Sequence, residues 1–215
     1  MRKQNLAPGE IYHVFNRGVD KRQIVMTPEN SERLVTCIDI FNQVEPEGGL
    51  YELNFSNQNK IKKSDPLVEI IAYCINPNHF HLILKQIADH GISKFMMKVM
   101  GGYSWYFNKK NKRSGPLFQG PFRAKHITTN EHLVHGSAYV NLNDRVHQLS
   151  AQGAELVRSS WLEYTTNIQG ICAKEIVLEQ FDSKDDYRIF ALDALTEMIR
   201  KRDDYAELKE ILMNE

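Results

Sequence analysis

Residues 67–84 read LVEIIAYCINPNHFHLIL, and this stretch decides the fold. Its two ends, residues 67–75 and 80–84, are rich in the apolar and β-branched side chains that strands favour. Asn76-Pro77-Asn78 stands between them, and asparagine and proline both favour tight turns. The stretch therefore predicts a β-hairpin.

The second strand of this hairpin carries two different faces, because side chains alternate along a strand. His79, His81 and Ile83 share one face, and the other face is apolar, with Phe80, Leu82 and Leu84. We expect the apolar face to pack against helices. The two imidazoles then stand about 7 Å apart along the backbone, which suits two ligands of one divalent metal. A pair of half-exposed sheet histidines is the alternative that the pattern leaves open.

Further strands and helices lie on both sides of the hairpin. Residue type and spacing predict strands over 11–16 and 122–127, and helices over 28–44, 91–107 and 130–142. This order fits an antiparallel sheet with helices on one face better than alternating βαβ units. We expect an α+β catalytic domain over residues 1–150, followed by a helical C-terminal extension over residues 151–215.

Composition excludes several classes of protein. The chain has 215 residues, with 42% hydrophobic and 25% charged residues, which is ordinary for a globular protein. No apolar run approaches the length of a membrane helix, and the N-terminal residues lead into no signal peptide. The three cysteines form neither a CxxC pair nor a disulfide framework. We therefore expect a cytoplasmic protein without a membrane partner.

The formal net charge is zero, with 27 basic and 27 acidic residues, but the charges are unevenly placed. Residues 91–130 hold eight Lys or Arg, no Asp or Glu, and several aromatic residues, whereas residues 175–215 carry a net charge of −6. Basic side chains bind phosphates and aromatic rings stack on unpaired bases. The expected DNA contacts are Arg17, Lys109, Lys110, Lys112, Arg113, Arg123, Lys125, Tyr103 and Trp105.

A second candidate feature lies on the helix predicted over 130–142. Tyr139 and Asn143 are four residues apart, so they share one helical face. If this face meets the histidine strand, the Asn143 amide completes a His/His/Asn metal site and the Tyr139 phenol is available as a nucleophile. An amphipathic helix with a core tyrosine is the alternative. Tyr103 and Tyr106 are rival nucleophiles.

These motifs together resemble the single-tyrosine HUH nucleases, and within them the insertion-sequence-200-like transposases. The REP-associated tyrosine transposases are the nearest group by motif. The resemblance covers roughly residues 8–165. It rests on blocks that follow one another in order: YHVFNRG (12–18), CINPNHFHLI (74–83), GYSWYFN (102–108), GPLFQGPFR (115–123), YVNLN (139–143) and SSW (159–161).

The resemblance implies a ferredoxin-like core and a metal-dependent DNA strand transferase. It makes His79, His81 and Asn143 ligands of Mg²⁺ or Mn²⁺, and makes Tyr139 the nucleophile that forms a 5′-phosphotyrosine. Single-stranded or hairpin DNA is the implied partner, and the implied location is the bacterial nucleoid. A homodimer and a monomer both stay open. Asp144 departs from the proline that usually follows this motif.

Two other hypotheses use the same residues. The first is a catalytically silent DNA- or RNA-binding module, domesticated as a regulatory protein. The second is a metal hydrolase that attacks with water instead of a tyrosine. A silent module has no need for all four of His79, His81, Tyr139 and Asn143, which favours the strand transferase.

Overall fold

A five-stranded antiparallel sheet forms the centre of the computed structural model, which describes residues 6–44 and 65–213. The strand order is β4-β1-β3-β2-β5. The strands are β1 (Ile11–Arg17), β2 (Val68–Ile75), β3 (His79–Gln86), β4 (Arg123–Ile127) and β5 (Arg158–Ser159). The predicted hairpin is present as β2 and β3, and the α+β class is confirmed.

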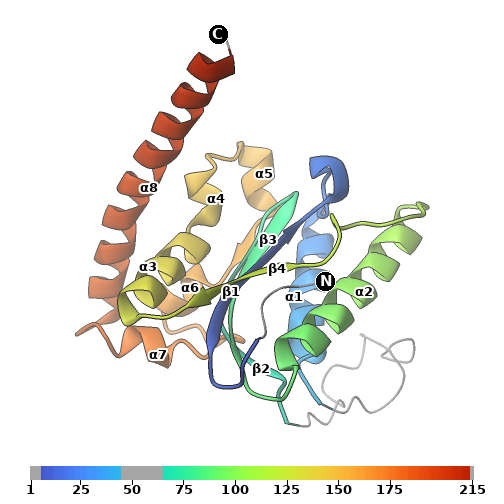
Figure 1. Cartoon of the computed structure of the whole chain (residues 1–215), viewed down its shortest axis with the longest axis horizontal. Helices are drawn as coiled ribbons and strands as arrows, with labels where there is room; N and C mark the ends of the chain where they lie inside the picture. Colours follow the sequence, from blue (N-terminus) through green and yellow to red (C-terminus); the bar gives the residue numbers. More distant parts are fainter. Residues whose placement is uncertain (1–5, 45–64, 214–215) are drawn as a thin grey trace.

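Helices α1 (Pro28–Ile40) and α2 (Gly91–Lys110) cover one face of the sheet (Figure 1). Phe80, Leu82 and Leu84 of β3 lie in the core that these helices close. Helix α2 is continuous through its two central glycines. A Cβ at Gly102 would lie 2.5 Å from the ring of Phe41, the C-cap of α1, so a glycine here allows the end of α1 to pack closely. The apolar face of β3 is therefore buried as predicted.

The other face is covered by α3 (Asn130–Asn141) and the long C-terminal helix α8 (Lys184–Met213) (Figure 1). The expectation of helices on one face is therefore wrong. Ile71, Ala72 and Ile83 form a second apolar patch, and it is buried under α3 and α8. The physical reason is that β2 is apolar on both faces, so both faces need a cover.

The chain after α3 is built from short elements that join the same core. They are α4 (Asn143–Val146), α5 (Ala151–Glu155), α6 (Trp161–Thr165) and α7 (Glu175–Leu178). Strand β5 pairs with β2, and Arg202 of α8 donates to the carbonyl of Val146 in α4. The division into domains at residue 150 stays a prediction.

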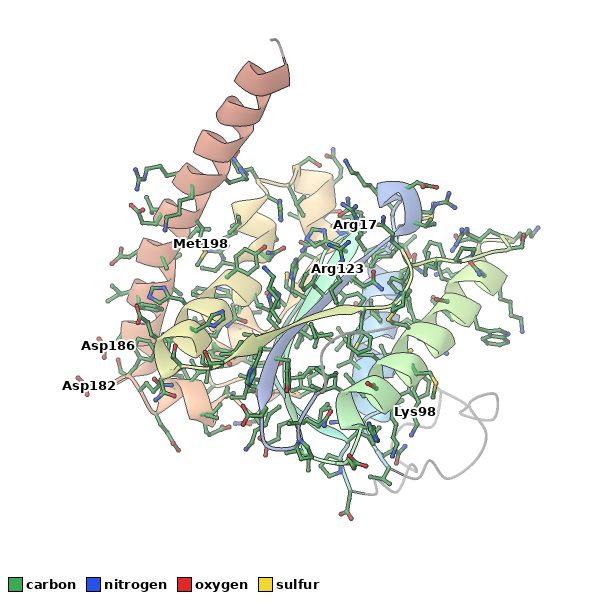
Figure 2. All side chains as sticks on the ribbon, viewed as in Figure 1. Arg17, Lys98, Arg123, Asp182, Asp186 and Met198 are labelled. Atoms are coloured by element: carbon green, nitrogen blue, oxygen red, sulfur yellow. The ribbon has the colours of Figure 1, made fainter. Side chains whose placement is uncertain are left out.

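Two residues of the acidic region 175–215 can be placed relative to two of the arginines that are expected to bind DNA. Asp182 and Asp186 lie at one edge of the molecule, away from Arg17 and Arg123 (Figure 2). These two acidic residues therefore do not cover that pair of arginines. Within residues 6–44 and 65–213, no helix combines the length and the apolar character needed to cross a membrane.

Candidate catalytic and metal site

The β2–β3 turn places two imidazoles at the start of β3. The Asn76 amide N–H donates to the His79 carbonyl over 2.8 Å, which closes the turn. The ring centroids of His79 and His81 are 5.1 Å apart, and the rings are nearly perpendicular. His81 is 8% exposed. The alternation predicted for this strand therefore brings both histidines to the face that also receives α3.

Asn143 reaches His79 from the first residue of α4. Helix α3 ends at Asn141, one residue earlier than expected, and the chain turns at Leu142 into α4. The fully buried Asn143 places its Oδ1 3.0 Å from His79 Nε2. The same Oδ1 accepts a hydrogen bond from Asn76 Nδ2 at 2.8 Å. The predicted His/Asn pair is thus in contact, although a helix break lies between Tyr139 and Asn143.

Tyr139 lies beside the histidines from the last turn of α3. Its ring centroid is 5.5 Å from that of His81 and 6.0 Å from that of His13, and both contacts are edge-on. Burial raises the pKa of Tyr139, and the neighbouring side chain of Asn143 acts in the opposite direction. The phenol is therefore protonated at neutral pH and needs help to lose its proton.

Burial keeps the imidazoles neutral. It lowers the pKa of His79 to about 4 and that of His81 well below the usual histidine value, because a charged ring would lose its hydration. Neighbouring histidines lower the pKa of His81 further. Neutral imidazoles carry a lone pair, which is the state that a metal ligand requires.

The atoms around His79 fit a divalent cation. His79 Nδ1 lies 2.6 Å from Asn78 Oδ1, which can only accept, so the ring proton sits on Nδ1 and Nε2 carries a lone pair. That lone pair lies 3.0 Å from Asn143 Oδ1, also an acceptor, and 3.1 Å from Asn76 Nδ2, which donates to both atoms. Adjacent ligands of an octahedral Mg²⁺ ion are separated by about 3 Å, given bonds of about 2.1 Å. Two acceptors at this separation are placed as neighbouring ligands.

Two amide atoms of residues that contact His79 lack a hydrogen-bond partner in the part of the chain that the structure describes. Among the described residues, Asn143 Nδ2 and Asn76 Oδ1 are buried without a hydrogen-bond partner. The described ranges also contain no cluster of three or more His, Cys, Asp or Glu side chains that could hold a metal. A metal site here therefore needs the amide of Asn143 as its third protein ligand, and hard cations accept such an oxygen.

A cavity of about 530 Å³ opens beside the two histidines. Its wall combines the aromatic ring of Phe15, the apolar side chain of Leu149 and three cationic side chains, Arg17, Lys21 and Arg123. Figure 2 shows Arg17 and Arg123 close together, and the pairing of β1 with β4 explains this arrangement. The cavity offers apolar and cationic surface together, as a nucleotide requires.

The other predicted DNA-binding residues are only partly near the cavity. Arg113 donates to Asn108 Oδ1 at 2.8 Å and to the Pro116 carbonyl, so it braces the loop after α2. Lys125 is an exposed residue of β4. The remaining exposed residues lie along the C-terminal half of α2 and just after it: Trp105, Lys109, Lys110 and Lys112.

The structure corrects the prediction made for Tyr103. It is fully buried, its hydroxyl donates to the Ile24 carbonyl, and its ring packs near Phe107 and Phe118. The prediction that Tyr103 contacts DNA is therefore wrong. Helix α2 lies across the sheet from the histidines, so neither Tyr103 nor Tyr106 is placed to act as the nucleophile.

Several residues of the site were not predicted from the sequence. Asn76 and Asn78 have the same signature as ordinary turn residues, and both contact His79. His147, at the end of α4, lies with its ring centroid 5.1 Å from that of His79. His13 contacts His81 from the neighbouring strand β1. The alternation of side chains along β1 was the sequence signal for this contact. His135, by contrast, packs against Phe190.

A buried polar network positions the helix that carries Tyr139. The Tyr187 hydroxyl of α8 accepts a hydrogen bond from Asn141 Nδ2 at 2.8 Å and lies 3.1 Å from Ser137 Oγ. Ser160 Oγ donates to Asn141 Oδ1 at 2.5 Å and accepts from the Tyr73 amide N–H. Helix α3 is thus tied to both α8 and the sheet.

Part of the chain matches the model of a known protein family. Residues 58–143 match the family model described as "Transposase IS200 like". The resemblance to these transposases is confirmed. The matched segment contains His79, His81, Tyr139 and Asn143, and it supports a transposase function.

One solved structure has the same fold. It is described as "Structure of the REP associates tyrosine transposase bound to a REP hairpin", and it superposes with a TM-score of 0.50 at 13% sequence identity. The match covers 80% of this chain and 88% of that chain. No curated protein matches the chain.

Proposed function

We propose that this protein is a metal-dependent strand transferase that cuts and rejoins single-stranded DNA through a 5′-phosphotyrosine. The proposal depends on one observation: His79 Nε2 and Asn143 Oδ1 converge at 3.0 Å while the Tyr139 ring lies 5.5 Å from that of His81. Two acceptors and a phenol at one point suit phosphoryl transfer better than DNA binding alone.

Tyr139 is the nucleophile in this proposal. Its Oη forms a bond to phosphorus, the bond from phosphorus to the 3′ oxygen breaks, the phenol loses its proton and the 3′ oxygen gains one. The covalent bond conserves the energy needed for rejoining, so no nucleotide cofactor is required. His79, His81 and Asn143 would hold Mg²⁺ or Mn²⁺, which would polarise the scissile phosphate and assist ionisation of the phenol.

The cavity would bind the DNA strand next to the scissile phosphate. Phe15 offers a ring for a base, and Arg17, Lys21 and Arg123 offer cations for phosphates. A hairpin is the proposed form of the substrate, because the solved structure of the same fold holds a REP hairpin. A homodimer stays a prediction.

The test is covalent capture of DNA. Labelled single strands, including hairpins with single-stranded flanks, are incubated with the full chain and Mn²⁺, and adducts that survive denaturing gels are counted. The wild type should form an adduct, and Tyr139→Phe should lower its yield by about 1,000-fold or more, as loss of a nucleophile does. Tyr106→Phe is the matched control and should retain the adduct.

Each alternative gives a different result. A silent binding module would shift DNA in native gels without any adduct. A hydrolase that uses water would cleave DNA equally well after Tyr139→Phe. Either result would overturn the proposal.

A further inference from the structure

His13 lies directly behind His81, on the neighbouring strand β1. Its Nε2 is 2.8 Å from His81 Nδ1, and the ring centroids are 5.0 Å apart with planes 25° apart, so the rings meet edge to edge. Phe15, two residues further along β1, stacks on His81 at 5.7 Å. His81 is therefore held at Nδ1 and on its ring face, and its Nε2 is left for the site.

Every element around His13 favours its neutral form. Lys125 is its partner across the β1–β4 pairing, and His132 of α3 is also close enough to act on it. Burial, Lys125 and His132 together lower the pKa of His13 to about 4. Tyr139 meets the ring edge-on. No carboxylate is among the groups that shift this pKa.

The direction of the hydrogen bond between the two rings decides what His81 can do. A neutral imidazole has one proton, so one nitrogen donates and the other accepts. If His81 Nδ1 donates to His13 Nε2, then His81 Nε2 carries a lone pair. If His13 donates instead, the proton of His81 moves to Nε2, and that atom can no longer bind a metal.

We propose that His13 is a positioning residue whose Nε2 accepts the Nδ1 proton of His81 and thereby fixes His81 Nε2 as a donor atom to a divalent cation. Asn78 Oδ1 does the same for His79 Nδ1 at 2.6 Å. The two histidines of β3 thus share one arrangement, with different partners. The inference deepens the proposed function, because it rests on the metal site at His79, His81 and Asn143.

The first test needs neither metal nor DNA. Nitrogen-15 NMR of the full chain at pH 7.5 identifies which nitrogen of His81 is protonated. The proposal requires Nδ1–H in the wild type, and finding the proton on Nε2 would overturn it. Because this measurement needs no variant, it does not depend on whether a substituted protein folds.

The second test measures Mn²⁺ affinity by the loss of the free-ion electron paramagnetic resonance signal. His13→Phe keeps a flat ring but removes the acceptor, and should weaken Mn²⁺ binding about 10- to 100-fold, as loss of an outer partner does. His13→Gln can present an amide oxygen near the same place and should stay within about 3-fold of the wild type. His126→Gln is the control, since His126 pairs with Glu10 on the edge strand.

The outcomes separate the two claims. If the wild type binds Mn²⁺ and His13→Phe binds it equally well, the role of His13 is refuted while the proposed function survives. If the wild type binds no Mn²⁺, the metal-dependent function is refuted, together with the metal-directed part of this inference. The protonation state of His81 then still shows whether His81 Nδ1 or His13 Nε2 donates the hydrogen bond between the rings.

Discussion

Successive side chains of β3 lie on opposite faces of the strand, and the two faces have different roles. On one face, Phe80, Leu82 and Leu84 are at most 2% exposed and lie in an apolar core. On the other, His79 contacts the buried amides of Asn143 and Asn76, and His81 contacts the imidazole of His13. The first face contributes hydrophobic burial, whereas the second holds polar groups that contribute little to stability unless each has a partner.

This difference indicates that the function lies on the polar face. Two buried amide atoms at the polar face have no hydrogen-bond partner within the described residues. Unpaired buried polar atoms destabilise a fold, so their presence here is better explained by function than by packing. The network of Tyr187, Asn141 and Ser160 supports that face from outside the site. Substitutions on the apolar face should therefore change stability, and substitutions on the polar face should change binding and chemistry.

Leu82→Ala should have the largest effect on stability. Leu82 is fully buried, so loss of its side chain should lower the free energy of unfolding by about 2–5 kcal/mol. Urea denaturation followed by circular dichroism measures the change. The fraction that remains folded should still bind Mn²⁺, and loss of metal binding by that fraction would break the separation between the two faces.

Tyr187→Phe should have the next largest effect. The change removes the hydroxyl that accepts from Asn141 Nδ2 in a fully buried position, and it should cost about 1–3 kcal/mol of unfolding free energy. Urea denaturation again gives the value. An unchanged stability would show that the network does not anchor α3 as described.

Asn143→Ala should act on the metal instead of the fold. It removes one of three proposed ligands and should weaken Mn²⁺ binding at least about 10-fold. Paramagnetic resonance titration measures the affinity. Asn167→Ala, at an exposed amide that meets Lys184, is the matched control. Equal affinity in both variants would remove Asn143 from the site.

Arg123→Ala should have the smallest effect. Arg123 lines the cavity, so its loss should weaken DNA binding and reduce the slope of log affinity against log salt by about 1. Lys98→Ala is the control from the same basic segment, since Lys98 lies far from Arg123 and donates to the Gln43 carbonyl (Figure 2). Equal slopes for the wild type and Arg123→Ala would mean that DNA binds at another surface of the protein.

Much of the site was predictable because its chemistry follows the simplest periodicities. The alternation along residues 79–84 separates ligands from core, and the spacing of Tyr139 and Asn143 brings both toward one point. The roles of these residues came from the family resemblance, since a phenol on a helix is equally typical of a core. The structure confirms that His79, Asn143 and Tyr139 lie close together.

The errors have physical causes. Tyr103 was assigned to DNA because aromatic residues among lysines occur both on base-stacking surfaces and on the buried side of an amphipathic helix. The cover on the second face was missed because α8 follows β2 by more than 100 residues, and local patterns carry no information about such contacts. Asn76 and Asn78 were assigned only to a turn because side-chain direction decides their second role.

The central claim is that His79, His81 and Asn143 hold one divalent cation beside Tyr139. Crystals of the full chain grown or soaked with Mn²⁺ test it through anomalous scattering. The account predicts one strong peak about 2.0–2.3 Å from His79 Nε2, His81 Nε2 and Asn143 Oδ1, near the Tyr139 hydroxyl. A bound Mn²⁺ ion that contacts only other residues, or no peak at saturating Mn²⁺, would contradict the account.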